Sequence, residues 1–141
     1  MKRSLIIVSI LLVAYLAILA KLIVFKFPPG VLQSGINLVP FSTILPYLTG
    51  EPNWAIAIRN LVGNILPFAP IGFLIPFSHR RIKWWHILIG GVAISLAFET
   101  LQLTLQKGSF DVDDILLNTL GVMLGWALFV AFKRLVIHSR S

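Results

Sequence analysis

The fold of this chain is decided by one segment, Trp84–Phe132, which has the sequence WWHILIGGVAISLAFETLQLTLQKGSFDVDDILLNTLGVMLGWALFVAF. Two apolar runs flank a short polar turn, and each run has about the 20 residues that an α-helix needs to cross a bilayer. Four of the five acidic residues of the chain lie within sixteen positions, Glu99–Asp114. Placing a carboxylate in hydrocarbon costs several kcal/mol. A cluster of acidic residues in one stretch of an apolar chain therefore indicates a functional site.

The composition of the whole chain agrees with a membrane protein. Of its 141 residues, 57% are hydrophobic and 12% are charged, whereas soluble domains have about 45–50% apolar and about 25% charged residues. The length suits one domain. We therefore expect an all-α integral membrane bundle over residues 1–141. The net charge of +7 does not indicate a nucleic-acid partner, because the basic residues cluster at the ends of apolar runs rather than on one soluble face.

Four transmembrane helices are expected, at residues 5–25, 54–77, 84–106 and 114–132. The first run follows Lys2 and Arg3, as in a cleaved signal peptide. It is longer than a usual signal-peptide core and no A-x-A site follows it, which favours a signal-anchor helix. Pro67 and Pro70 are expected to kink or break the second span.

Basic residues give the bundle a direction. Eight fall on one side of a four-span chain: Lys2, Arg3, Arg80, Arg81, Lys83, Lys133, Arg134 and Arg140. Only Lys26 and Lys107 fall in loops on the other side. By the positive-inside rule, both termini are expected to be cytoplasmic. The apolar segment between the first two spans is then external. We expect it to be interfacial or re-entrant, with Pro40 and Pro46 interrupting any helix.

Two opposite charges lie at matching depth in this topology. Arg59 is about 8 Å into the second span from outside, and Glu99 is about 10 Å below the outer end of the third. Intramembrane charges usually face the interior and find a partner, so an Arg59–Glu99 pair is expected. Such a pair has two open interpretations. It is either a structural ion pair that orients helices or a clamp for a substrate headgroup or a proton-linked gate.

Helical spacing collects further polar side chains on one stripe of each span. The stripes are Asn60 and Asn64; Glu99, Gln102 and Gln106; and Asp114, Asn118, Gly121 and Gly125. The two glycines form a small-xxx-small pair suited to close helix contact. The polar members lie toward the outer ends, which predicts a polar pocket open to the external leaflet. The asparagines can equally hydrogen-bond across helices, as is common at intramembrane contacts.

The acidic turn indicates a site whose ligands are oxygen atoms. All three histidines map to the cytoplasmic side and the chain has no cysteine, so a zinc site is not expected. Asp111, Asp113 and Asp114 are the candidates for binding Mg²⁺ or Ca²⁺, which favour carboxylates. A carboxylate can also act as a general base. Asp113 or Asp114 is suited to cap the fourth span. Asp111 lies outside that cap and is expected to have a pocket role.

Four sequence blocks resemble the VanZ-like membrane proteins, a family named for a glycopeptide-resistance accessory protein. They are INLVPFSTI (Ile36–Ile44), RNLVGNILPFAPIGF (Arg59–Phe73), ETLQ (Glu99–Gln102) and GSFDVDDILLNTLGVMLGW (Gly108–Trp126). The last block, D-x-D-D-x-x-x-N-T-x-G-x-x-x-G, is the most specific. The resemblance adds a loop motif, Asn37, Pro40 and Phe41. In the family pattern G-R-x-F-D, this chain has Lys107 one position earlier, without the fork of an arginine.

The resulting candidates for the pocket are Arg59, Asn60, Asn64, Glu99, Gln102, Lys107, Asp111, Asp114 and Asn118. We expect an envelope protein that binds a lipid or lipid-linked precursor headgroup in an outward-facing pocket. The resemblance implies a location in a bacterial cytoplasmic membrane and lowered susceptibility to teicoplanin-type glycopeptides. One alternative is an enzyme that acts on an outer-leaflet phospho- or glycolipid through an acidic, Mg²⁺-dependent site. Another is a small proton-linked transporter, which at this size would need a homodimer.

Overall fold

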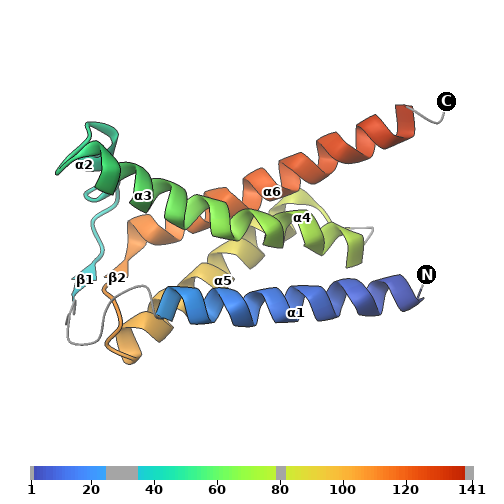
Figure 1. Ribbon diagram of the computed structural model, residues 1–141, viewed down its shortest axis with the longest axis horizontal. Coiled ribbons are helices and arrows are strands. Elements are labelled where there is room, and N and C mark those ends of the chain that lie inside the picture. The colour runs from blue at the N-terminus through green and yellow to red at the C-terminus, as the bar shows by residue number, and fades with distance from the viewer. Residues whose placement is uncertain (1, 25–34, 79–81, 139–141) are drawn as a thin grey trace.

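The computed structural model describes residues 2–24, 35–78 and 82–138. The elements are α1 (Lys2–Val24), β1 (Ile36–Asn37), α2 (Ile44–Leu48), α3 (Trp54–Ile65), η1 (Leu66–Phe68), α4 (Ala69–Ser78), α5 (Trp84–Thr104), β2 (Phe110–Asp111) and α6 (Val112–His138). The predicted helical architecture is confirmed, with two very short strands added. The start of α1 and the end of α6 lie at the same end of the molecule (Figure 1).

Three segments are long and apolar enough to cross a membrane, namely Trp54–Phe77, Trp84–Thr104 and Val112–Val136. They correspond to the last three predicted spans, and α6 continues beyond the predicted end at residue 132. The first predicted span is also helical, but its apolar part, Ile6–Leu22, is shorter. Lys26, Arg80, Arg81 and Arg140, which carried part of the orientation argument, lie outside the described residues.

The second predicted span is broken where its prolines fall. Helix α3 ends at Ile65, one 3₁₀ turn follows, and α4 continues from Ala69. Pro67 lies in that turn, where its missing N–H and its ring disfavour a regular helix. The hydroxyl of Tyr15 in α1 donates to the carbonyl oxygen of Pro67 at 2.6 Å. A neighbouring helix therefore supplies a donor at the break, as membrane helices require.

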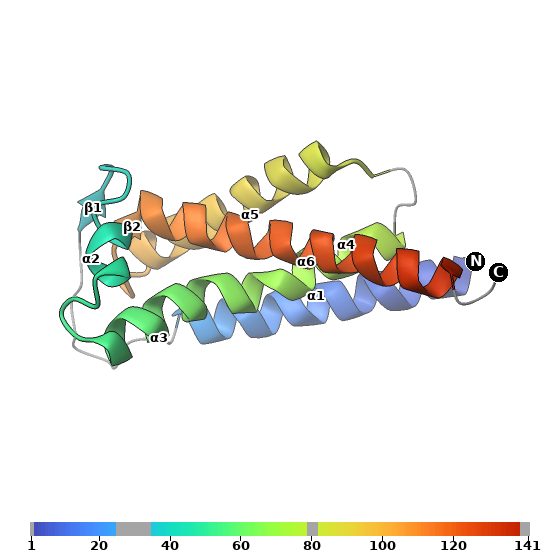
Figure 2. The same ribbon diagram turned by 90° about the horizontal axis from the view of Figure 1, so that it is seen from above.

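Helix α6 is the centre of the bundle and contacts α3, η1, α4 and α5 (Figure 2). Its glycines allow this close packing. A Cβ on Gly121 would lie 2.1 Å from the carbonyl oxygen of Ile65, and a Cβ on Gly125 would lie 1.8 Å from that of Ala69. The predicted small-xxx-small contact is confirmed, because only glycine lets the two backbones approach this closely.

A small apolar core fills the middle of the bundle. Leu19, Phe68, Ile71, Ile87 and Val122 are almost completely buried there. The ring of Phe68 meets that of Phe98 edge to face, with centroids 5.8 Å apart. Helix α1 joins this core by packing against α4 and α5. The core fixes how η1 and α5 lie relative to each other, and both elements carry residues of the site described below.

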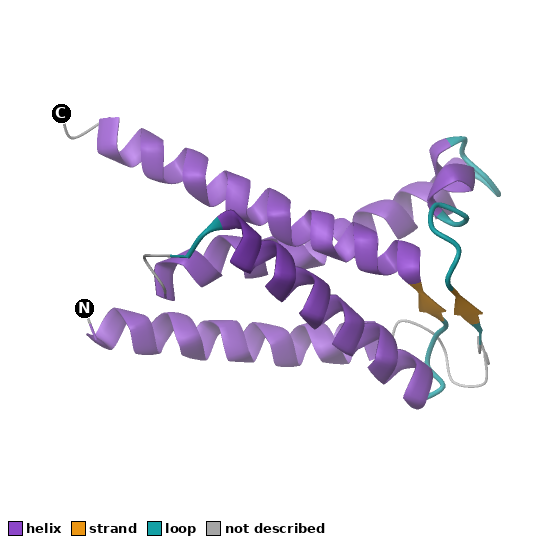
Figure 3. Cartoon of the chain, turned by 180° about the vertical axis from the view of Figure 1, so that it is seen from behind, coloured by secondary structure: helices purple, strands orange, loops and turns teal. Residues whose placement is uncertain are grey.

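A pair of two-residue strands closes the end of the bundle opposite the termini (Figure 3). β1 runs parallel to β2, with Ile36 opposite Phe110 and Asn37 opposite Asp111. The expected interfacial segment continues from β1 into α2, which packs against α3. Pro40 precedes α2, but Pro46 lies inside it. The expectation that Pro46 interrupts a helix is therefore wrong, since a proline in the first turn removes no hydrogen bond.

Candidate functional site

Buried polar side chains gather around the first turns of α6. Those with less than a tenth of their surface exposed are Asn64, Ser95, Glu99, Gln102, Asp111, Asp113, Asn118 and Thr119. They come from α3, α5, β2 and α6, which places residues far apart in the sequence in one region. Burying polar groups is costly unless they are hydrogen-bonded. Their contacts therefore show which of them hold the fold and which face a space.

Asp113 fastens the loop before α2 to the helix α6. Its side chain is fully buried. Its Oδ1 accepts a hydrogen bond from the backbone N–H of Phe41 at 2.6 Å, and its Oδ2 accepts from Thr43 at 2.7 Å and Ile44 at 3.1 Å. Phe41 has a left-handed φ of 67°, the backbone conformation from which its N–H meets the carboxylate. Such charge-assisted bonds are strong, so Asp113 is a structural anchor.

Asp111 caps α6. Its Oδ1 accepts from the backbone N–H of Asp113 at 2.8 Å, the usual bond from an N-cap side chain to the second helical residue. Asn37 also donates to Oδ1 at 3.0 Å, and the Thr43 hydroxyl donates to Oδ2 at 2.7 Å. The cap was expected from Asp113 or Asp114, and that expectation is corrected. Because β2 ends at Asp111, its side chain folds back over the first turn of α6.

Behind this cap lies a cavity of about 210 Å³ between α1, α3, η1, α5 and α6. Its polar lining residues are Arg59, Asn64, Glu99, Gln102, Asp114 and Asn118, and its other lining residues are Leu19, Leu22, Gly63, Pro67 and Phe68. Six of the nine predicted pocket residues thus face one space. A concave site with an apolar wall and a few convergent polar groups is the usual form of a ligand pocket.

Hydrogen bonds between these polar residues join neighbouring helices. Asn64 Nδ2 donates to Asp114 Oδ1, and Asn118 Nδ2 donates to Ser95 Oγ at 2.9 Å. Asn118 is only 2% exposed, and its Oδ1 has no hydrogen-bond partner. A buried acceptor left unpaired costs about 1–3 kcal/mol. This oxygen has almost no accessible surface, so it lies in the packing between the helices rather than against the open space.

Arg59 and Glu99 both line this cavity but differ in their exposure. Arg59 is exposed at its rim, whereas Glu99 is 2% exposed and its Oε2 accepts from the backbone N–H of Asp111 at 3.2 Å. Their shared cavity agrees with the matching depths expected from the sequence. A direct ion pair between them stays a prediction.

The remaining candidates lie outside the cavity lining. Asn60 donates to the carbonyl oxygen of Ile56 in its own helix at 2.9 Å. The backbone N–H of Lys107 donates to the carbonyl oxygen of Gln102 at 2.9 Å. Of the loop motif, Asn37 binds Asp111 through its side chain, while Pro40 and Phe41 are exposed. The loop motif thus belongs to the anchor around Asp111 and Asp113.

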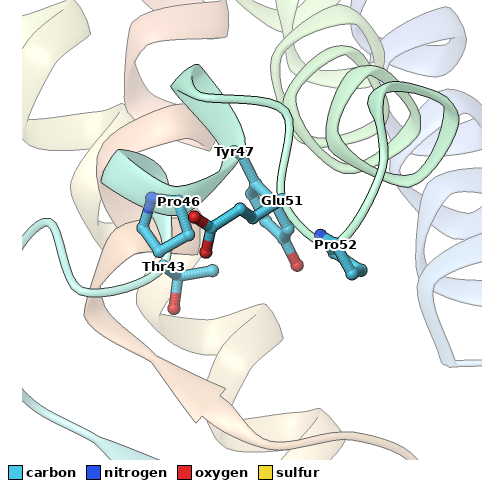
Figure 4. A pocket seen from close by; sticks show the side chains of 5 residues that line it. All are labelled: Thr43, Pro46, Tyr47, Glu51 and Pro52. Carbon is cyan, nitrogen blue, oxygen red and sulfur yellow. The ribbon is translucent and has the colours of Figure 1, made fainter.

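A second, open pocket of about 380 Å³ lies over the turn from α2 to α3 (Figure 4). Thr43, Pro46, Tyr47, Glu51 and Pro52 line it. Burial raises the pKa of Tyr47, and the negative charges of Asp114 and Asp111 raise it further. Tyr47 thus lies within the electrostatic influence of both carboxylates.

Two contributors to the network were missed in the sequence. Thr43 binds Asp111 and Asp113 across about 70 residues of chain, for which no local pattern gives a signal. Ser95 is four residues before Glu99 on the same face of α5, and this helical spacing would have found it.

The described residues contain no group of three or more acidic or histidine side chains arranged to hold a metal ion. Asp111 and Asp113 instead receive N–H and O–H donors. The contacts thus explain these two carboxylates without a metal, and binding of Mg²⁺ or Ca²⁺ stays a prediction.

Comparisons with known proteins match the whole region just described. The family model VanZ/LLP1 matches residues 12–133, from α1 to α6. Protein VanZ of Enterococcus faecium is 30% identical over 125 residues, which are 84% of this chain and 71% of that protein. No solved structure shows a significant match. This chain therefore belongs to the VanZ/LLP1 family.

Proposed function

We propose that this VanZ-family protein crosses a bacterial cytoplasmic membrane four times and binds a lipid or lipid-linked precursor headgroup from the outer side. Three helices have the required length, and α1 packs beside them against α4 and α5. The start of α1 and the end of α6 lie at one end (Figure 1), as an even number of crossings requires. The basic residues near those ends favour a cytoplasmic location for both.

The observation that carries this proposal is the amphiphilic cavity with its exposed rim. Leu22 in α1 and Arg59 and Gly63 in α3 are exposed, while Leu19, Glu99 and Asn118 in the same lining are buried. Helix α1 packs on α4 and α5 but only sparsely on α3. The rim therefore opens sideways between α1 and α3, toward the hydrocarbon in a membrane. A headgroup can enter by this route while its chains stay among lipids.

At the cell surface, this binding would change how envelope-directed antibiotics meet their lipid-linked targets. Membership of the VanZ/LLP1 family supports a lowered susceptibility to teicoplanin-type glycopeptides as the phenotype. The binding partner is then a membrane lipid or a lipid-linked envelope precursor. The enzymatic alternative, the proton-linked transport alternative and a homodimer stay predictions.

The substitution Gly63→Leu tests this proposal by filling the cavity without removing a polar group. A Cβ on Gly63 meets nothing within 4 Å, and leucine is a better helix former than glycine. The purified variant should fold but retain little of the bound lipid that native mass spectrometry finds on the unmodified chain.

Gly90→Leu in α5 is the matched control, because a Cβ there also meets nothing within 4 Å and Gly90 does not line the cavity. It should keep the bound lipid. Equal lipid binding by the unmodified chain and Gly63→Leu would overturn the proposal.

A further inference from the structure

The open pocket over the turn from α2 to α3 contains a charged group that the proposed lipid site does not use. Its volume is about 380 Å³, and two of its lining residues are Tyr47 and Glu51. Figure 4 shows the side chains of both residues directed into this opening. Within the described residues, neither the Glu51 carboxylate nor the Tyr47 hydroxyl makes a hydrogen bond or an ion pair. Both groups are therefore free to bind a ligand.

The turn that carries Glu51 is held in place by its own contacts. The backbone N–H of Glu51 donates to the carbonyl oxygen of Pro46 at 2.9 Å, and that of Gly50 donates to the carbonyl oxygen of Tyr47 at 3.2 Å. Gly50 has a left-handed φ of 81°, and a Cβ there would lie 2.5 Å from Cε2 of Trp54. The indole ring thus packs directly on the turn. A preformed site loses less conformational entropy on binding, so this pocket is suited to hold a small ligand.

The pocket combines one negative charge with aromatic and apolar surface. The exposed carboxylate of Glu51 lies in the same lining as the ring of Tyr47. A cation is attracted both by a carboxylate and by the face of an aromatic ring. Burial raises the pKa of Tyr47, so its hydroxyl stays protonated and neutral at physiological pH. The side chains of Pro46 and Pro52 have no polar atoms, and they provide contact surface for an alkyl chain.

Other classes of ligand fit this lining less well. None of the described lining residues is basic, so an anion would meet only the repulsion of Glu51. Mg²⁺ and Ca²⁺ need several oxygen ligands, and the described residues contain no group of three or more acidic or histidine side chains that could hold a metal ion. The volume of about 380 Å³ corresponds to roughly twelve waters at about 30 Å³ each. That is room for a group the size of one long side chain.

We propose that this pocket binds a protonated primary amine on a short alkyl chain, at the end of the bundle opposite the termini (Figure 1). The ammonium group donates to the carboxylate of Glu51 and lies against the ring of Tyr47, while the alkyl chain contacts Pro46 and Pro52. The amine belongs either to a free small molecule or to a lysine side chain of a peptide. This site is separate from the lipid cavity and does not depend on it.

The test measures binding to the full chain in an uncharged detergent by fluorine nuclear magnetic resonance. Trp54, which packs on Gly50 beside the pocket, is the reporter after labelling with fluorotryptophan, and Trp54→Phe identifies its signal. N-acetyl-lysine methylamide should shift this signal with a millimolar dissociation constant, because exposed ion pairs and cation–π contacts are individually weak. Its neutral Nε-acetyl derivative should bind about tenfold more weakly. Equal binding of the two would overturn the recognition of a cation.

Three further ligands define the chemistry of the site. The Nε-trimethyl derivative keeps the charge but has no N–H donor on that nitrogen, so it should bind about threefold more weakly. Equal binding of this derivative would overturn the preference for a primary amine. Putrescine, a free diamine, separates the two sources, because the tighter of putrescine and the lysine derivative identifies the source. Mg²⁺ at the same concentration should leave the signal in place, and a shift caused by Mg²⁺ would overturn the selectivity for an organic cation.

Variants connect the binding to the pocket. Glu51→Gln should weaken binding of the lysine derivative about fivefold and leave its neutral Nε-acetyl derivative unchanged. Tyr47→Leu should weaken it about threefold, whereas Tyr47→Phe keeps the ring and should keep the binding. Leu48→Ala, exposed on the same short helix but outside the pocket lining, is the control and should change nothing. Unchanged binding in Glu51→Gln would overturn the assignment of the amine to this carboxylate.

Gly63→Leu separates this inference from the proposed lipid function. It fills the cavity between α1 and α3 but does not touch the turn from α2 to α3, so it should lose lipid binding and keep amine binding. Loss of both in this variant would overturn the separate amine site. Failure of every amine to bind the unmodified chain would overturn this inference and leave lipid binding in place.

Discussion

Two neighbouring regions of α6 use acidic residues in opposite ways. At its start, Asp111 and Asp113 are buried and their oxygens receive donors from the chain itself. One residue later, Asp114 lines a cavity together with Glu99 and Asn118. Successive helical residues point about 100° apart, which sends Asp113 to the loop and Asp114 to the cavity. One short acidic motif thus supplies both an anchor and a binding surface.

The difference separates stability from function within a single motif. The anchor holds a loop some 70 residues away in sequence against α6, so its loss should mainly unfold the protein. The cavity has an exposed rim, so changes there should mainly affect binding. Substitutions at the anchor should therefore change stability most, and substitutions in the cavity should change binding most.

The largest expected effect is on stability, at the anchor. Asp113→Ala leaves three backbone N–H groups of the loop without their acceptor and should lower the free energy of unfolding by about 3–5 kcal/mol. Thermal unfolding in detergent measures the loss. Glu51→Ala removes an exposed carboxylate and should cost less than about 0.5 kcal/mol. A similar loss of unfolding free energy in both variants would contradict the role of Asp113 as an anchor.

Packing around α6 should show the next largest effect. Gly121→Ala places a Cβ 2.1 Å from the carbonyl oxygen of Ile65 and should cost about 1–3 kcal/mol through overpacking. Gly63→Ala, on the cavity wall, meets nothing within 4 Å and should be neutral or slightly stabilising. Chemical unfolding of the two variants compares them directly; a stable Gly121→Ala would contradict the close contact of α6 with the end of α3.

A smaller effect on stability should accompany a loss of binding at Asp114. Asp114→Asn keeps the size of the side chain and should cost about 1 kcal/mol of stability, since Asn64 can still donate to its oxygen. Binding of the lipid should nevertheless fall, because the cavity lining loses one of its charged groups. The same two measurements on Asp113→Asn should show the reverse, a larger loss of stability and a smaller loss of binding. Equal losses of stability and of binding in the two variants would contradict the separate roles of anchor and cavity.

The smallest expected effect is a pH dependence at Tyr47. Burial and the charges of Asp114 and Asp111 raise the pKa of Tyr47 above its usual 10.0. A raised folded-state pKa contributes stability that is complete below the unfolded value and is lost as pH rises through the folded value. The loss should therefore begin above about pH 10. The chain has two tyrosines, so absorbance titration of Tyr47→Phe reports Tyr15 alone. Subtracting that curve from the curve of the unmodified chain gives the titration of Tyr47. A Tyr47 titration at the usual pH would contradict its proximity to the two carboxylates.

The sequence predicted the helices and the break well, because these depend on local chemistry. Apolar runs located α3 to α6, Pro67 located the 3₁₀ turn, and Gly121 and Gly125 located the close contact. The matching depths of Arg59 and Glu99 placed both on one cavity. These predictions needed only helical geometry and the length of a membrane helix.

The roles of Asp111 and Asp113 were harder to predict, because they depend on a long-range contact. A strand pair of two residues on each side is too short to give a pattern with a period of two. Without that pair, nothing places Phe41 and Thr43 next to Asp113. Asp111 was accordingly expected to face the pocket, and the structure uses it as the cap.

The central claim is that a lipid headgroup occupies the cavity, and photocrosslinking tests it most directly. A phospholipid with a photoreactive group near the headgroup would be mixed with the full chain, and the labelled peptides mapped by mass spectrometry. The account predicts label on the cavity segments 59–68 and 114–118, lost in Gly63→Leu and kept in Gly90→Leu. Label confined to exposed positions outside the cavity, such as Leu120, and unchanged in Gly63→Leu, would contradict it.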